Sequence, residues 1–150
     1  MDDLSIDIVW SHSTDAAFPN SHHITFSGDQ IVHSDAAPDW GGNALAANPE
    51  QALAAAMASC HMMTFLALAK KANWPVVDYK DHATAHLGKN PAGQMAVVKI
   101  QLSPVVSMDP SFETDDAMLQ TMHERAHRYC FIANSMADSV DVEIDPARAP

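Results

Sequence analysis

The sequence predicts an α+β fold in which largely antiparallel sheets pack with one long central helix and a second helix that ends at a cysteine. Three observations lead to this class. Short segments alternate apolar and polar residues, a stretch of 18 residues (52–69) has no acid, Lys or Arg, and a later segment repeats apolar residues every three to four positions. Strands, helix, strands, helix and strand, in that order, are typical of α+β proteins.

The first strands are expected near the N-terminus. The segment Leu4–Trp10 alternates apolar and polar side chains, as a strand with one buried face does. Ile24–Phe26 and Ile31–His33 are predicted to pair as a hairpin, because Gly28-Asp29 between them tolerates the positive φ of a tight turn. Residues 34–47, rich in Asp, Pro, Gly, Asn and Ala, predict a long loop, and such loops are often functional.

The long helix is predicted to begin after Asn48 and to end near Lys71. Asn48 can cap free amides, Pro49 suits the first helical position, Glu50 suits the positive end of the helix dipole, and Gln51 can bond back to the cap. Its apolar stretch is long enough to span a membrane. Polar residues in its middle and many alanines favour instead the central buried helix of a soluble fold.

The second half of the chain predicts two strands, a helix and a last strand. Val76–Leu87 and Gln94–Ser107 are expected as two long strands of one hairpin. A helix introduced by residues 109–114 should run to about Tyr129, and Ser139–Ile144 alternates as a strand does. Because the chain has 150 residues and no segment with the composition of a linker, we expect a single domain over residues 1–150.

Composition and charge restrict the possible partners. With 8 Lys and Arg against 19 Asp and Glu, the net charge is −11, which argues against nucleic acid and anionic membranes as partners. An apolar fraction of 47% indicates a globular protein rather than a disordered one. The first residues, Met-Asp-Asp-Leu, carry acids where a secretory signal carries basic residues, so we expect a cytoplasmic protein.

Two groups of residues could carry chemistry. Cys60 and Cys130 lie far apart and form no C-x-x-C motif, so they are either inert core thiols or a working redox pair. His123 and His127 complete an H-E-x-x-H pattern, which is typical of zinc hydrolases. Only Glu143 follows as a distant third ligand, and a solvated helix face is the favoured interpretation, so no metal is expected.

Two motifs resemble those of a known family. Residues 48–60, Asn-Pro-Glu-Gln-Ala-Leu-Ala-Ala-Ala-Met-Ala-Ser-Cys, resemble the N-P-E-(E/Q)-L-x-A-A-x-x-(A/S)-(A/S)-C stretch of the OsmC/Ohr family, the osmotically inducible and organic hydroperoxide resistance proteins. Residues 126–135 resemble that family's A-H-x-x-C-P-x-S-N-(S/A) element. The order of predicted elements over residues 4–145 also agrees, so the resemblance covers nearly the whole chain and implies an OsmC-like fold.

The resemblance implies an activity and an assembly. Members are intertwined homodimers with two sites at the subunit interface, and they reduce organic hydroperoxides without a cofactor. In this chain Cys60 would attack the peroxide and Cys130 would resolve the sulfenic acid, after which an external dithiol would restore both thiols. Glu50 would complete the site from the partner subunit, because ten residues of helix put it about 15 Å from Cys60.

The chain also departs from the family pattern. Peroxidase members pair an upstream Arg with the motif Glu, yet this chain has no Arg before Arg125, and Phe131 stands where the family has Pro. We expect a member of an OsmC-like branch without that Arg, in which His127 and Arg128 are possible activating cations. The predicted function is a thiol-dependent peroxidase in oxidative-stress defence. The alternative is a non-catalytic dimer of structural or small-molecule-binding function, with an inert Cys60.

Overall fold

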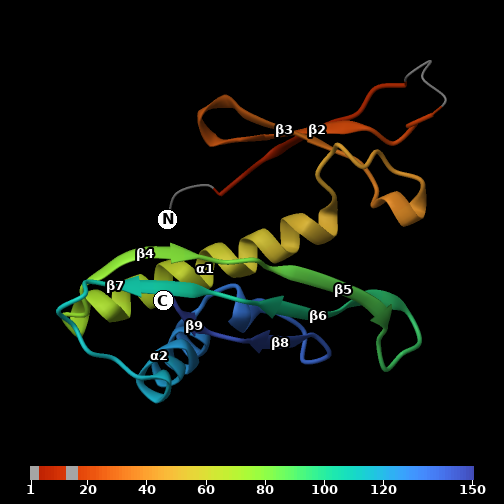
Figure 1. Cartoon of the computed structure of the whole chain (residues 1–150). Helices are drawn as coiled ribbons and strands as arrows, with labels where there is room; N and C mark the ends of the chain where they lie inside the picture. Colours follow the sequence, from red (N-terminus) through yellow and green to blue (C-terminus); the bar gives the residue numbers. More distant parts are fainter. Residues whose placement is uncertain (1–3, 13–16) are drawn as a thin grey trace. The chain divides into compact units, whose positions relative to one another are not determined.

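A computed structural model of the chain describes residues 4–12 and 17–150 (Figure 1). The chain forms two compact units, residues 1–52 and residues 53–150, and the boundary falls in the first turn of the long helix. Whether the whole chain acts as the single domain predicted from its length stays a prediction.

The first unit contains a three-stranded antiparallel sheet. Its strands, in spatial order, are β1 (Asp7–Val9), β2 (His22–Phe26) and β3 (Gln30–Ser34). The predicted hairpin is confirmed, and its turn places Gly28 and Asp29 at φ of 69° and 58°. The first strand is shorter than the alternation over residues 4–10 suggested, since only three residues pair with β2.

The predicted loop over residues 34–47 is held by a buried acid. The Asp35 carboxylate accepts hydrogen bonds from the Ser21 hydroxyl at 3.0 Å and from the amides of Ala36 and Asn43 at 2.7 and 3.1 Å. A Cβ on Gly42 would lie 1.6 Å from the carbonyl oxygen of Ala36, so only glycine fits there. The loop contains one short 3-10 turn, Pro38–Trp40.

The long helix α1 (Pro49–Lys71) begins with the predicted capping box. The Gln51 amide donates to Asn48 Oδ1 at 2.8 Å, and the Asn48 amide donates to Gln51 Oε1 at 3.1 Å. Lys70 and Lys71 end the helix where its dipole favours positive charge.

The predicted burial of the long helix is only partial within a single chain. Its buried residues form one stripe at helical spacing: Ala54, Met57, His61, Phe65 and Ala69. The most apolar 18 residues have a mean hydropathy of 1.7, yet only 28% of them are buried. By length and composition α1 could cross a membrane, a test that core helices of soluble proteins also pass.

Six strands of the second unit form two three-stranded sheets. One has the order β4 (Val76–Lys80), β7 (Val105–Met108), β9 (Ala147–Arg148), and the other β5 (Thr84–Lys89), β6 (Met95–Leu102), β8 (Asp141–Ile144). The β4·β7 and β5·β6 pairs are antiparallel, whereas β8 and β9 add in parallel.

The two long strands predicted for this region are wrong in one respect, because each is broken in the middle. Residues 81–83 separate β4 from β5, and residues 103–104 separate β6 from β7. Pro104 has no amide hydrogen to donate to a ladder, and the Ser103 amide donates instead to Asp81 Oδ1 at 2.7 Å. Each half of the long hairpin therefore joins a different sheet.

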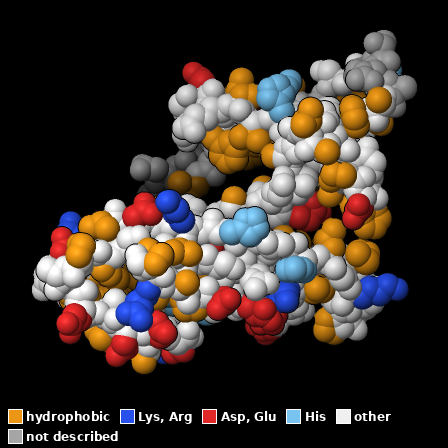
Figure 2. All heavy atoms as spheres, in the orientation of Figure 1, with side chains coloured by type: hydrophobic (Ala, Val, Ile, Leu, Met, Phe, Trp, Pro, Cys, Tyr) orange, Lys and Arg blue, Asp and Glu red, His pale blue; other side chains and the backbone are white. Residues whose placement is uncertain are grey.

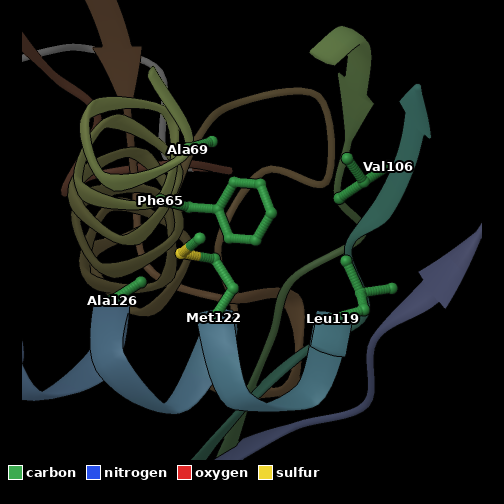
Figure 3. Packing of buried hydrophobic residues seen from close by; sticks show 6 residues of the cluster. All are labelled: Phe65, Ala69, Val106, Leu119, Met122 and Ala126. Carbon is green, nitrogen blue, oxygen red and sulfur yellow. The ribbon is translucent and has the colours of Figure 1, made fainter. Parts of the chain in front are cut away.

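Helix α2 (Asp116–Tyr129) packs across α1. Asp115 caps it by accepting from the Met118 amide at 2.7 Å, so the helix begins directly after residues 109–114, which were predicted to introduce it, and ends at the predicted Tyr129. Figure 3 shows the core between α1, α2 and β7, made of Phe65, Ala69, Val106, Leu119, Met122 and Ala126. A second core cluster lies where α1 meets β6 and the end of α2: Ala54, Met57, Ile100, Leu102 and Cys130.

Candidate active site

The fold brings the two cysteines together. Cys60 lies in the middle of α1 and is partly exposed, whereas Cys130 follows the last turn of α2 and is fully buried. Cys60 packs against the core cluster that contains Cys130, and the two free thiols share a hydrogen bond. Residues 70 positions apart in the sequence thus form one two-sulfur site within the second unit.

The surroundings of Cys60 favour its ionised form. Partial burial is the largest single influence on the pKa of this thiol and raises it. Hydrogen bonds to the sulfur act in the opposite direction, and their donors are the Cys130 thiol, the backbone amides of Ile132 and Phe131, and the Thr64 hydroxyl. Together these bonds outweigh burial and hold the pKa of Cys60 below its ordinary value.

Cys130 has the opposite tendency. Its burial, followed by its hydrogen bond to Cys60, raises the pKa of Cys130 to about 11. The Ala133 amide, 3.4 Å from Cys130 Sγ, acts against this rise without cancelling it. The pair therefore consists of Cys60, whose pKa is held below its ordinary value, and Cys130, which stays protonated at neutral pH and donates to it.

Thr64 was not identified from the sequence, although it lies one helical turn after Cys60. Its hydroxyl donates to the Cys60 carbonyl oxygen at 2.8 Å, and it is also a hydrogen-bond partner of the Cys60 sulfur. A hydroxyl has one hydrogen and serves one acceptor at a time. The bond to the carbonyl oxygen and the bond to the Cys60 sulfur are therefore alternatives for the same hydrogen.

A buried pair of histidines lies beside the cysteines. His61 Nε2 and His123 Nδ1 are 2.9 Å apart, and the His123 ring stacks on Phe65 at 4.4 Å. Burial, followed by the charge of His127, lowers the pKa of His61 to about 4. Burial, followed by the charge of His61, lowers the pKa of His123 to about 3. Both rings are neutral at pH 7, and sequence analysis missed the pair because its members come from different helices.

The H-E-x-x-H pattern does not form the ligand set that a zinc site needs. His123 is turned into the core toward His61, while the exposed Glu124 accepts a hydrogen bond from Gln120 at 3.1 Å. Over residues 4–12 and 17–150, no three His, Cys, Asp or Glu side chains are grouped so that they could hold a metal ion.

The remaining predicted site residues lie at other places. Glu50 is in the first turn of α1, and its buried Oε2 has no hydrogen-bond partner among the described residues. His127 is half-buried and its charge acts on His61, whereas Arg128 is exposed and its carbonyl oxygen accepts from Asn134. None of these three side chains is among the groups that most strongly shift the pKa of Cys60. Their roles in catalysis stay predictions.

Comparison with known proteins identifies the family. The sequence matches the family described as OsmC-like protein over residues 41–145. It is 28% identical, over 79% of this chain and 82% of the relative, to the organic hydroperoxide resistance protein-like 2 of Staphylococcus saprophyticus.

Solved structures agree with the sequence match. An OsmC-like protein of unknown function from Vibrio cholerae is 33% identical and superposes with a TM-score of 0.86, covering 96% of this chain and 99% of the other. An organic hydroperoxide resistance protein from Elizabethkingia anophelis, 16% identical, shares the fold with a TM-score of 0.79 over 99% and 98% of the two chains. This α+β chain therefore belongs to the OsmC-like family, as its two motifs predicted.

Proposed function

We propose that this protein is a thiol-dependent peroxidase that reduces organic hydroperoxides. The observation that carries the proposal is the two-sulfur site, in which a partly exposed Cys60 with a lowered pKa accepts a hydrogen bond from a buried Cys130. Only a thiolate attacks a peroxide efficiently, and a second thiol within reach traps the sulfenic acid before it is oxidised further. The name of the relative from Staphylococcus saprophyticus, organic hydroperoxide resistance protein-like 2, supports the substrate class.

The proposed reaction has three steps. The Cys60 thiolate attacks the terminal peroxide oxygen, the O–O bond breaks, and the alkoxide leaves and takes a proton from water to become an alcohol. Cys60 now carries the hydroxyl as a sulfenic acid, and Cys130 attacks its sulfur, which forms a disulfide and releases water. An external dithiol then reduces this disulfide through exchange and is itself oxidised to a disulfide.

We further propose that two copies of the chain form a homodimer that completes each site. Figure 2 shows apolar side chains on the surface of both units, and large exposed ones include Met63 and Val77, at 58% and 64% exposure. A second copy would cover such surface. It would also bring the partner's copy of Glu50 to the cysteines, which the rise along α1 keeps from Cys60 of the same chain. The need for a dithiol reductant agrees with the cytoplasmic location expected from the sequence.

The direct test is oxidation of the reduced protein with one equivalent of cumene hydroperoxide, followed by thiol mapping by mass spectrometry. We expect a rapid disulfide between Cys60 and Cys130 and an equivalent of cumyl alcohol. Cys60→Ser serves as the matched control and should give neither product. Two free, unreactive thiols in the wild-type protein would contradict the proposal and favour the non-catalytic binding or structural dimer.

The proposed activating cations have their own test in the same assay. If His127 or Arg128 supplies charge to the site, then His127→Ala or Arg128→Ala slows disulfide formation several-fold at pH 7. Lys71→Ala, which removes an exposed cation at the far end of α1, is the control. Unchanged rates in both variants would remove these residues from the site.

A further inference from the structure

Two histidines face each other on neighbouring strands of the first unit. His23 of β2 and His33 of β3 are directly opposite in the antiparallel register, and both side chains are exposed. His23 Nε2 lies 3.0 Å from His33 Nδ1, and the two ring planes are inclined at 82°. Among the described residues, neither ring is hydrogen-bonded to any other group. One nitrogen of each ring is therefore aimed at the space between the two strands.

The separation of these nitrogens suits two neighbouring ligands of one metal ion. Imidazole nitrogens bind transition metals at about 2.0–2.1 Å, and two such ligands lie about 2.8–3.4 Å apart in square-planar, octahedral or tetrahedral geometry. The observed 3.0 Å falls within that range. Without a metal, one ring donates its N–H hydrogen to the other. When an ion binds, that proton moves through water to the other nitrogen of the same ring, and both facing nitrogens present a lone pair.

The pair opens into a hollow that has room for water. This hollow has a volume of about 450 Å³, and its walls include Val9, Ser11, Ser21 and Asn43. No three His, Cys, Asp or Glu side chains are grouped as metal ligands in the described part of the chain, so water would complete the coordination of an ion here. Imidazole ligands suit Cu²⁺, Ni²⁺ and Zn²⁺, whereas Mg²⁺ and Ca²⁺ prefer oxygen.

The charge of this part of the chain also favours a cation. Residues 1–52 contain eight Asp and Glu, and the chain has no Lys or Arg before Lys70. A dication that approaches the first unit therefore meets no lysine or arginine of that unit, and the net negative charge of the segment attracts it.

We propose that His23 and His33 form a binding site for one divalent transition-metal ion, which links β2 to β3. The site shares no residue with the two cysteines, and it does not depend on the proposed peroxidase reaction. Its ligands come from two strands that the hairpin turn already holds in register, so little order has to be gained when the ion binds.

The test is titration of the reduced protein with Ni²⁺, followed by isothermal titration calorimetry. Ni²⁺ is chosen because it binds imidazole well and, unlike Cu²⁺, does not oxidise thiols. A second ligand on the same chain acts at high effective concentration, so His23→Ala and His33→Ala should each weaken binding by about 100-fold. The double variant should bind about as weakly as either single variant, since one histidine alone forms no chelate.

Two further variants serve as controls. His82→Ala removes an exposed histidine of the second unit and should bind Ni²⁺ as the wild-type protein does. Cysteine thiolates also bind Ni²⁺, so Cys60→Ser is titrated too and should retain the site. Wild-type affinity in His23→Ala or in His33→Ala would overturn the proposal, as would loss of binding in Cys60→Ser with unchanged binding in His23→Ala.

Thermal unfolding gives an independent readout. A ligand that binds the folded chain and not the unfolded one raises Tm. Ni²⁺ should therefore raise the Tm of the wild-type protein and of His82→Ala, and it should leave the Tm of His23→Ala and His33→Ala unchanged. An equal rise in all four proteins would contradict a site made by this pair.

Discussion

Cys60 and His61 are neighbours in α1, but the surroundings of Cys60 favour its charged form and those of His61 disfavour it. Cys60 points to the turn after α2, where thiol, amide and hydroxyl donors lower its pKa despite partial burial. His61 points to the core around Phe65, where burial lowers its pKa to about 4 and keeps the ring neutral. The comparison shows that one helix can carry, in adjacent positions, a thiol whose anion is favoured and an imidazole whose cation is disfavoured. What separates them is the supply of hydrogen-bond donors rather than position along the helix.

The core around Phe65 is the region whose loss should cost most. Phe65 is fully buried and contacts Trp74, Tyr79 and His123 at ring separations of 6.4, 5.6 and 4.4 Å. Phe65→Ala is expected to lower the free energy of unfolding by about 3–5 kcal/mol, because a large cavity replaces the ring. Urea unfolding at pH 7 measures this.

The same variant sharpens the comparison between the two regions. All but one of the donors to Cys60 come from Cys130 and the turn after it, so the pKa of Cys60 should be nearly unchanged in folded Phe65→Ala. Lys71→Ala, an exposed change in α1, should shift stability by no more than about 0.5 kcal/mol. The description would be contradicted if Phe65→Ala lowered the free energy of unfolding by less than about 1 kcal/mol. It would also be contradicted if Phe65→Ala shifted the pKa of Cys60, because the Phe65 core and the cysteine site would then not be independent.

Low pH should lower the free energy of unfolding through the buried His61–His123 pair. The unfolded chain binds protons at His61 and His123 below about pH 6.5, whereas the folded chain binds them only near pH 4 and pH 3. Stability contributed by the neutral pair is therefore complete above about pH 6.5 and falls as the pH drops toward 4. We expect a loss of about 3–4 kcal/mol between pH 7 and pH 5 in urea unfolding.

A variant with one histidine fewer separates this effect from general acid sensitivity. His123→Gln retains hydrogen-bonding groups but does not titrate, so its loss between pH 7 and pH 5 should be about half that of the wild-type protein. An equal pH dependence in both proteins would mean that the pair is not the source of the acid sensitivity.

Removal of the Cys130 thiol should change the free energies less than Phe65→Ala or the drop from pH 7 to pH 5 does. Cys130→Ala deletes one neutral donor to Cys60 and keeps the amide and hydroxyl donors. A hydrogen bond to a charged group contributes about 1.5–3 kcal/mol, so the pKa of Cys60 should rise by about one to two units. Alkylation kinetics measure the shift, and Cys130→Ser, which retains a donor, is the control. A lower pKa in Cys130→Ala would contradict the described arrangement.

Sequence patterns predicted the elements better than their junctions. The capping box at Asn48 and the turn at Gly28 were predictable, because each depends on residues a few positions apart. The break at Pro104 was not recognised, although proline cannot donate to a strand ladder. The partial burial of α1 was not predicted either, because the apolar composition of a helix does not determine how much of it one chain covers.

The candidate site was predictable only in part. Cys60 and Cys130 were identified from two motifs, and the fold brings them together. The amides of Phe131 and Ile132 were not predicted as part of the site, because every residue except proline has a backbone amide and only the fold decides where it points. The His61–His123 pair escaped for a related reason, since its members come from helices that meet only in the folded chain.

The most direct test of the central claim is the pH dependence of iodoacetamide labelling at each cysteine, resolved by mass spectrometry in the folded and in the urea-unfolded protein. The account predicts that Cys60 in the folded protein reaches half of its maximal rate at lower pH than Cys60 in the unfolded chain. Cys130 in the folded protein should react slowly until well above pH 9. Equal midpoints for folded and unfolded Cys60, or faster labelling of Cys130 at pH 7, would contradict the account.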